Sequence, residues 1–168
     1  ATFFVVGRRA QALPDLVHRE IAEGHEIGNH TMTHVGWNDK SYDESLAEIL
    51  EAQKAISSVT GSEPVFFRSP HGQNTKANAQ AIVDSHLQAV RWTIGVEHHA
   101  SGSAQAEADR VAAAVRPGTI ILAHDGGLDR SETVEALSIL LNKLDAQGYE
   151  VVPLGELLKE GQGLARTP

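Results

Sequence analysis

The sequence predicts an α/β protein built on a parallel sheet. Strand patterns and helical patterns alternate along the whole chain, and the strand segments are short and uniformly apolar. Strands that are apolar on both faces are typical of parallel sheets covered by helices. Between six and seven β/α units fit into 168 residues, as an open doubly wound sheet or as a barrel. The chain shows no linker or internal repeat, so we predict one domain over residues 1–160 and a disordered tail over residues 161–168.

Local sequence signals define each element in turn. Apolar runs predict strands at residues 2–6, 25–29, 65–67, 88–92, 119–123 and 149–152. The first helix begins at Pro14, which fits the first helical position, and ends at Gly24. Apolar residues at three- and four-residue steps predict the longest helix, and Thr75 caps the next one. The full set of predicted helices is 14–24, 42–59, 75–85, 104–115, 131–146 and 155–160.

Composition excludes several classes of protein. The net charge of -8 argues against a nucleic-acid-binding protein, which needs basic patches. No apolar run approaches the roughly 18 residues that a membrane-spanning helix needs. The absence of cysteine rules out disulfides and thiolate metal sites. No signal peptide is visible, and because the chain starts inside a strand we expect it to be N-terminally incomplete.

Four polar or aromatic residues lie where predicted strands end, namely His30, Arg68, Trp92 and His124. In parallel α/β folds the carboxyl ends of the strands form the edge where active sites are built. Arg68 follows two phenylalanines, so we expect it to leave a buried segment and to pair with a carboxylate. Core packing is the alternative for Trp92 and His124, since both residue types are often buried without a catalytic role.

The segment His-Thr-Met-Thr-His places His30 and His34 four residues apart. On one helical turn, residues at this spacing share a face. Two imidazoles there can reach one metal ion, provided that a third ligand is present. The hydroxyl residues between them can begin and cap such a turn. A pair of exposed histidines in a loop is the alternative reading.

Four motifs, taken together and in the order in which they occur, resemble those of the polysaccharide deacetylases of carbohydrate esterase family four, which carry the NodB-homology domain. A-T-F-F-V-V-G resembles the second strand of that domain, and H-T-M-T-H resembles its metal-binding H-[ST]-x-x-H motif. R-S-P-H-G resembles R-x-P-[YF]-G, and I-L-A-H-D-G resembles the final L-x-H motif. The resemblance covers nearly the whole chain. It implies a distorted (β/α) barrel, incomplete at its N-terminal end in this chain.

The resemblance also implies a role for each matching residue. His30 and His34 would bind a divalent metal, most often Zn²⁺, with Co²⁺ or Ni²⁺ also suited to such ligands. His124 would be the general acid, and Arg68 would orient the catalytic carboxylate. The main-chain N–H of His71 would help to hold the oxyanion.

Substrate-contacting residues follow from the same resemblance. Trp92 and Leu122 would line the slot for the acetyl methyl group, and Pro70 would lie at the substrate. The implied substrate is an acetylated polysaccharide or oligosaccharide: N-acetylglucosamine in peptidoglycan or chitin, or O-acetyl xylan. Such substrates imply a secreted or cell-envelope protein.

The chain departs from the family pattern in three places. The T-F-D-D motif, whose aspartates supply the general base and the third metal ligand, is absent from the sequence. No D-x-x-D-W motif follows Trp92, so Glu97 is the candidate for the carboxylate that tunes His124. His71 replaces the usual aromatic residue, which is harmless if only its backbone acts.

These departures leave two alternatives to a working deacetylase. One is a catalytically impaired, carbohydrate-binding pseudoenzyme. The other is a fragment that needs a second polypeptide to complete the barrel and to supply the missing aspartates.

Overall fold

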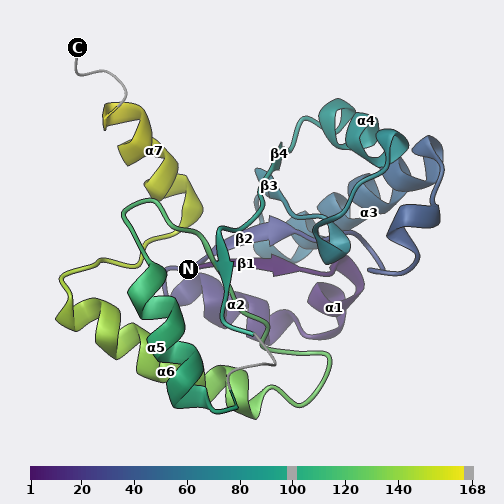
Figure 1. Ribbon diagram of the computed structural model, residues 1–168. Coiled ribbons are helices and arrows are strands. Elements are labelled where there is room, and N and C mark those ends of the chain that lie inside the picture. Colours follow the sequence, from purple (N-terminus) through teal and green to yellow (C-terminus); the bar gives the residue numbers. More distant parts are fainter. Residues whose placement is uncertain (98–101, 165–168) are drawn as a thin grey trace. The chain divides into compact units, whose positions relative to one another are not determined.

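The computed structural model describes residues 1–97 and 102–164. His98 and His99, which we expected in a loop, and residues 165–168 of the predicted tail lie outside these ranges. The chain forms two compact units, one of residues 1–91 and 153–159 and the other of residues 92–152 and 160–168. Each unit contains its own parallel sheet (Figure 1). A single domain over residues 1–160 stays a prediction.

The first unit contains a four-stranded parallel sheet in the order β1-β2-β3-β4. Its strands are β1 (Thr2–Val5), β2 (Glu26–Asn29), β3 (Phe66–Phe67) and β4 (Gln88–Ala89). Val5 pairs with Asn29, and Asn29 pairs with Phe67. The first three strands therefore end in one row, which brings His30 and Arg68 to the same edge of the sheet.

The helices of the first unit are α1 (Gly7–Ala12), α2 (Pro14–Ala22), α3 (Tyr42–Thr60) and α4 (Lys76–Asp84). The last two begin at side-chain caps. Ser41 forms a capping box with Glu44 at the start of α3, and Gly61 closes that helix with φ of 74°. Thr75 caps α4 as predicted. α7 (Leu154–Leu164) starts in this unit.

Two apolar clusters form the core of the first unit. One is buried between α3, α4 and the sheet and contains Trp37, Ile49, Phe67, Ala81, Ile82 and Leu87. The other joins α1, α2 and α3 and contains Ala10, Val17, Ala52 and Ile56. Helix α3 contributes to both clusters, which makes it the central helix of this unit.

The second unit contains a two-stranded parallel sheet of β5 (Ile94–Gly95) and β6 (Ile121–Leu122). Helices α5 (Ala104–Ala114) and α6 (Ser131–Ala146) pack against each other (Figure 1). Their core consists mainly of small and branched residues: Val96, Ala104, Ala108, Val111, Ala112, Val115, Ala136, Leu140 and Leu144. Ser103 caps α5 through the main-chain N–H of Ala106.

Several predicted elements differ from the structure. The strand predicted at 88–92 ends at Ala89, because after Val90 the chain leaves the first sheet and joins the second at Ile94. Residues 149–152 form no strand, since the N–H of Tyr149 instead closes the end of α6. Helix α1 was missed, because small residues rather than an apolar stripe form its buried face. Helix α7 continues through Leu164, four residues into the predicted tail.

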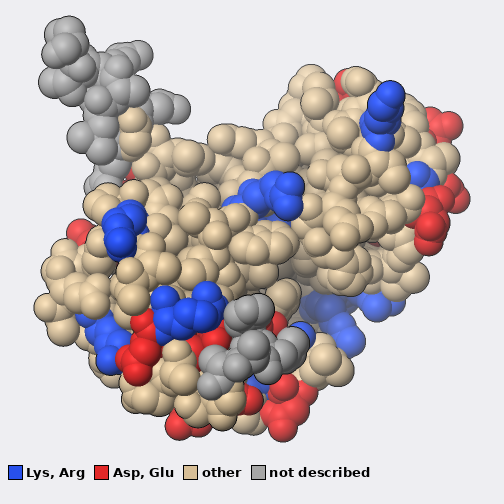
Figure 2. All heavy atoms as spheres, in the orientation of Figure 1, with Lys and Arg blue, Asp and Glu red and all other residues tan. Residues whose placement is uncertain are grey.

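Charged side chains of both signs occur in small separate groups on the face shown in Figure 2, and most of that face belongs to other residues. Among the described residues, none of the helices combines the length and apolarity that crossing a membrane requires.

Candidate active site

His30 and His34 lie together just after β2, as predicted. Their ring centroids are 4.8 Å apart, with 66° between the ring planes. The predicted helical turn is wrong, however, because residues 30–34 form a loop. Thr31 and His34 adopt left-handed backbone angles, with φ of 67° and 66°. Two left-handed residues break a right-handed helix, and the rings meet through this sharp turn instead.

The hydroxyl of Thr31 caps this turn by accepting a hydrogen bond from the N–H of His34 at 3.0 Å. The N–H of Thr31 donates to Oδ1 of Asn29 at 2.9 Å, and Nδ2 of Asn29 donates to the carbonyl of Ile49 at 3.0 Å. Asn29 and Thr31 are both buried. The predicted capping role of a hydroxyl residue is therefore found, in a loop rather than in a helix.

The imidazole of His30 is oriented by the main chain of the neighbouring strand. Its Nδ1 lies 2.6 Å from the carbonyl oxygen of Arg68. A carbonyl only accepts hydrogen bonds, so Nδ1 carries the proton and Nε2 carries the lone pair. Histidine metal ligands in proteins usually have this arrangement, in which the second ring nitrogen donates to a carbonyl or carboxylate.

Arg68 follows β3 and is buried, with 9% of its surface exposed. Its guanidinium lies over the ring of Phe4, 4.1 Å from the centroid. Burial lowers the pKa of Arg68 to about 10, which leaves the group charged at neutral pH. A buried cation of this kind favours an anionic partner. The predicted pairing of Arg68 with a catalytic carboxylate stays a prediction.

Pro70 and His71 form a short turn after Arg68. Pro70 is buried, and His71 has a left-handed φ of 57°. The ring of His71 lies 5.1 Å from the ring of His34, which we did not expect, because only its backbone was assigned a role. A third histidine within the R-S-P-H-G motif was the available signal. Its main-chain contact with an oxyanion, and the contact of Pro70 with substrate, stay predictions.

The donor set fits part of a divalent metal site. Two imidazoles, one with a defined tautomer, suit zinc or cobalt. Within residues 1–97 and 102–164, no three His, Cys, Asp or Glu side chains are grouped closely enough to hold a metal.

His124 lies just after β6 in the second unit, and Glu97 lies just after β5. Nδ1 of His124 is 2.9 Å from Oε2 of Glu97, and the N–H of His124 donates to Oε1 at 2.8 Å. Arg130 donates to the same Oε2 at 3.0 Å. Glu97 therefore has the position relative to His124 that we expected of a tuning carboxylate.

A pocket of about 360 Å³ lies beside this pair, in the second unit. It is lined by Trp92, Gly95, Glu97, Arg110, Leu122 and His124. Trp92 does not end a strand, contrary to our prediction, but lies between β4 and β5. It nevertheless shares this pocket with Leu122 and His124. Their role in holding an acetyl methyl group stays a prediction.

The family model for polysaccharide deacetylases matches residues 1–90. The chain is 37% identical over 161 residues to a peptidoglycan-N-acetylglucosamine deacetylase of Bacillus cereus, covering 95% of this chain and 75% of the relative. It is 36% identical over 169 residues to a chitooligosaccharide deacetylase of Bradyrhizobium, covering 94% of this chain and 77% of the relative.

Solved structures confirm the α/β fold class. A family 4 acetyl xylan esterase from Clostridium thermocellum, in complex with cobalt, matches with a TM-score of 0.84 and 34% identity, over 95% of this chain and 77% of the other. A pseudoenzyme of the same family from Bacillus anthracis matches with a TM-score of 0.83 and 28% identity, over 94% of this chain and 55% of the other. The chain therefore belongs to the polysaccharide deacetylases of carbohydrate esterase family 4.

Proposed function

We propose that the protein removes acetyl groups from a carbohydrate polymer by hydrolysis, using a divalent metal bound by His30 and His34. The observation that carries this proposal is the adjacency of the two imidazoles, with the ring of His30 oriented by the bond from Nδ1 to the main-chain carbonyl of Arg68. We propose zinc as the metal, because imidazole together with carboxylate oxygen suits it.

When bound, such a metal supplies a Lewis acid for the acetyl carbonyl and the attacking water. His124 supplies a proton to the leaving group, while Glu97 holds Nδ1 and stabilises the charged ring. Water loses a proton to the general base and adds to the acetyl carbon. The bond from that carbon to nitrogen or oxygen then breaks, the leaving atom takes the proton from His124, and acetate and the sugar amine or alcohol are released. Arg68 would orient the carboxylate that acts as general base.

The substrate class follows from what the relatives act on. Their names specify peptidoglycan N-acetylglucosamine, chitooligosaccharide and acetyl xylan. We propose an acetylated polymer of this group as substrate, and consequently a secreted or cell-envelope location.

Acetate release tests this proposal directly. The full-length natural protein, loaded with zinc, would be incubated with peptidoglycan, chitin oligomers and acetylated xylan, in parallel with a His30→Ala variant. We expect release from at least one polymer and a loss of that release to background in the variant. Equal release by both proteins would overturn the proposal.

A sugar-binding pseudoenzyme is the second candidate. It is supported by the similarity to the Bacillus anthracis pseudoenzyme and by the absence of a D-x-x-D-W motif after Trp92. Calorimetric titration distinguishes the two. Binding of chitin oligomers without zinc uptake would favour the pseudoenzyme, and zinc uptake with turnover would exclude it.

We also propose that these 168 residues alone are inactive unless another polypeptide or segment supplies carboxylates. The described residues bring together only two of the three ligands that such a metal needs. Turnover by the isolated 168-residue chain would contradict this.

A further inference from the structure

The loop that carries the two histidines has an unusual backbone. Within the described ranges, only four residues other than glycine have positive φ, and three of them are Thr31, His34 and His71. Residues with a Cβ avoid this conformation unless their surroundings hold them in it, and such positions concentrate at functional sites. Something must therefore hold this loop in place.

The N-terminus of α1 holds the loop from one side. Gly7 donates its N–H to the carbonyl of Thr31 at 2.9 Å, and Arg8 donates to the carbonyl of Met32 at 3.1 Å. These bonds fix the first half of the loop. They leave Thr33, which directly precedes His34, to be fixed by other groups.

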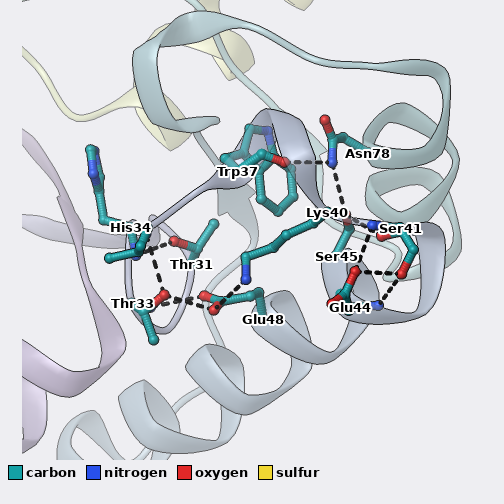
Figure 3. A network of polar contacts seen from close by, with 11 residues as sticks. Thr31, Thr33, His34, Trp37, Lys40, Ser41, Glu44, Ser45, Glu48 and Asn78 are labelled. Atoms are coloured by element: carbon teal, nitrogen blue, oxygen red, sulfur yellow. Dashed lines mark hydrogen bonds and ion pairs between the residues drawn. The ribbon is translucent and has the colours of Figure 1, made fainter.

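Glu48 of helix α3 holds Thr33 from the opposite side. Its Oε2 accepts the main-chain N–H of Thr33 at 2.9 Å, and its Oε1 accepts the hydroxyl at 2.7 Å. Figure 3 shows the carboxylate pointing at Thr33, with the ammonium group of Lys40 approaching from the other side. The Lys40 nitrogen is 3.3 Å from Oε1.

Glu48 is buried, with 9% of its surface exposed. Burying a carboxylate is unfavourable unless hydrogen bonds and an opposite charge compensate it. Here the compensation comes from Lys40 and from the loop itself. The helix and the loop are therefore tied by two charge-assisted bonds, which are stronger than neutral ones.

We infer that Glu48 is a positioning residue for the metal site, acting through Thr33 on the orientation of His34. This inference rests on the proposed metal-binding role of His30 and His34. Glu48 would act through its two bonds to Thr33, the residue next to His34. Its loss would let the loop relax toward ordinary backbone angles and would spread the two rings.

Metal affinity and a cobalt spectrum test the inference on the full-length natural protein. Affinity for Co²⁺ would be measured by competition with a coloured chelator, and ligand geometry by the visible absorption of the cobalt-loaded protein. We expect Glu48→Ala to weaken binding about 10- to 100-fold, the range for groups that support metal ligands, and to alter the cobalt bands. Glu48→Gln keeps an acceptor for Thr33. Its affinity for Co²⁺ should therefore lie between that of Glu48→Ala and that of the wild type.

Glu51→Gln is the matched control, since Glu51 is an exposed residue one turn further along α3. It should bind cobalt as the wild type does. If Glu48→Ala fails to fold, Thr33→Val is the milder variant. It removes the 2.7 Å bond to Glu48 and the 3.3 Å bond that the hydroxyl accepts from the N–H of Val35, but it keeps the main-chain bond to Glu48. It should weaken cobalt binding about 3- to 10-fold, the lower part of the range expected for Glu48→Ala.

His30→Ala separates the two proposals. If it leaves cobalt binding unchanged, the proposed metal site itself is wrong. If His30→Ala abolishes binding while Glu48→Ala or Thr33→Val binds with wild-type affinity and spectrum, only the positioning role is wrong.

Discussion

Both carboxylate oxygens of Glu97 contact His124, one through the ring Nδ1 at 2.9 Å and the other through the main-chain N–H at 2.8 Å. The first contact selects the tautomer, and the second fixes the backbone from which the ring projects. Arg130 shares the oxygen that faces the ring. Since Glu97 follows β5 and His124 follows β6, the pairing of these two strands sets the contact.

Replacing Glu97 with glutamine should lower kcat for acetate release with little change in KM. The amide can still accept a hydrogen bond from the ring, but it no longer supplies the negative charge that stabilises a protonated imidazole. We expect a loss of about 10- to 100-fold, a part of what general acid catalysis contributes. Glu150→Gln, an exposed substitution in the same unit, is the control. A kcat equal to that of the wild type would rule out this role of Glu97.

Removal of the metal should abolish acetate release, and the metals that restore it should indicate which kind of ligand the site contains. Treatment with a chelator should reduce acetate release to background, and zinc or cobalt should restore it. Magnesium should not restore it, because Mg²⁺ prefers oxygen ligands and the described site offers two imidazoles. Restoration by magnesium as effective as by zinc would point to a metal site made of other residues.

Gly7 lies where α1 and α3 approach the histidine loop most closely. A Cβ added there would lie 2.7 Å from the sulfur of Met32 and 2.9 Å from the Cα of Ala52. The methionine can move, but the backbone of α3 cannot move without disturbing the core. Gly7→Ala should therefore lower the free energy of unfolding by about 1–3 kcal/mol, the usual cost of overpacking.

Denaturant unfolding of the metal-free protein measures this change. Gly161→Ala is the matched control, since a Cβ there would meet nothing within 4 Å and alanine favours helix over glycine. That control should be neutral or slightly stabilising. A Gly7→Ala protein as stable as the wild type would show that the loop and α3 separate easily.

Local signals in the sequence were sufficient to locate most of the helices. Pro14, Gly24 and Thr75 mark ends that the structure reproduces to within a residue or two. The long apolar pattern of α3 and the alanine-rich pattern of α5 were found for the same reason. Each of these signals acts within a few residues of the chain, so it can be read without tertiary information.

The failures come from tertiary constraints. His30 and His34 are four residues apart whether they lie on a helix or in this loop. The loop conformation is selected by hydrogen bonds that residues 31 and 33 make with Gly7, Asn29 and Glu48. Gly7 and Glu48 lie far from the histidines in the sequence, so no local pattern connects them to the histidine loop. The prediction that Trp92 ends a strand failed for a similar reason. The point at which the chain leaves one sheet and joins another depends on which strand it pairs with.

The site residues could be listed from motifs, but their supporting contacts could not. Paired histidines and a strand-end histidine are recognisable because their chemistry is unusual. Glu48 resembles any glutamate on a helix face, and its spacing with Glu44 and Glu51 by itself indicates a charged face exposed to solvent. Burial of Glu48 corrects that reading, while Glu44 and Glu51 remain exposed.

Glu48 should also make stability depend on acid pH. Burial by itself would raise the pKa of Glu48, but hydrogen bonds from the side chain and main chain of Thr33, together with Lys40, outweigh it and lower the pKa below its ordinary value. A carboxyl whose pKa is lower in the folded than in the unfolded state stabilises the fold at neutral pH. That stabilisation is complete above the unfolded pKa of about 4.3 and is lost as the pH falls through the folded value.

The difference in unfolding free energy between wild type and Glu48→Gln should therefore change with pH. We expect the variant to be less stable by about 1–3 kcal/mol at pH 7, the scale of hydrogen bonds to a charged group. Below about pH 4 the difference should shrink progressively, and it should disappear only once the pH has fallen below the lowered pKa of Glu48 in the folded state, where the group is protonated in both states. Denaturant unfolding from pH 3 to 7 in the presence of a chelator checks this without interference from metal binding to the histidines. A difference that stays constant over this range would mean that the charge of Glu48 does not stabilise the fold, and that only the shape of its side chain holds Thr33.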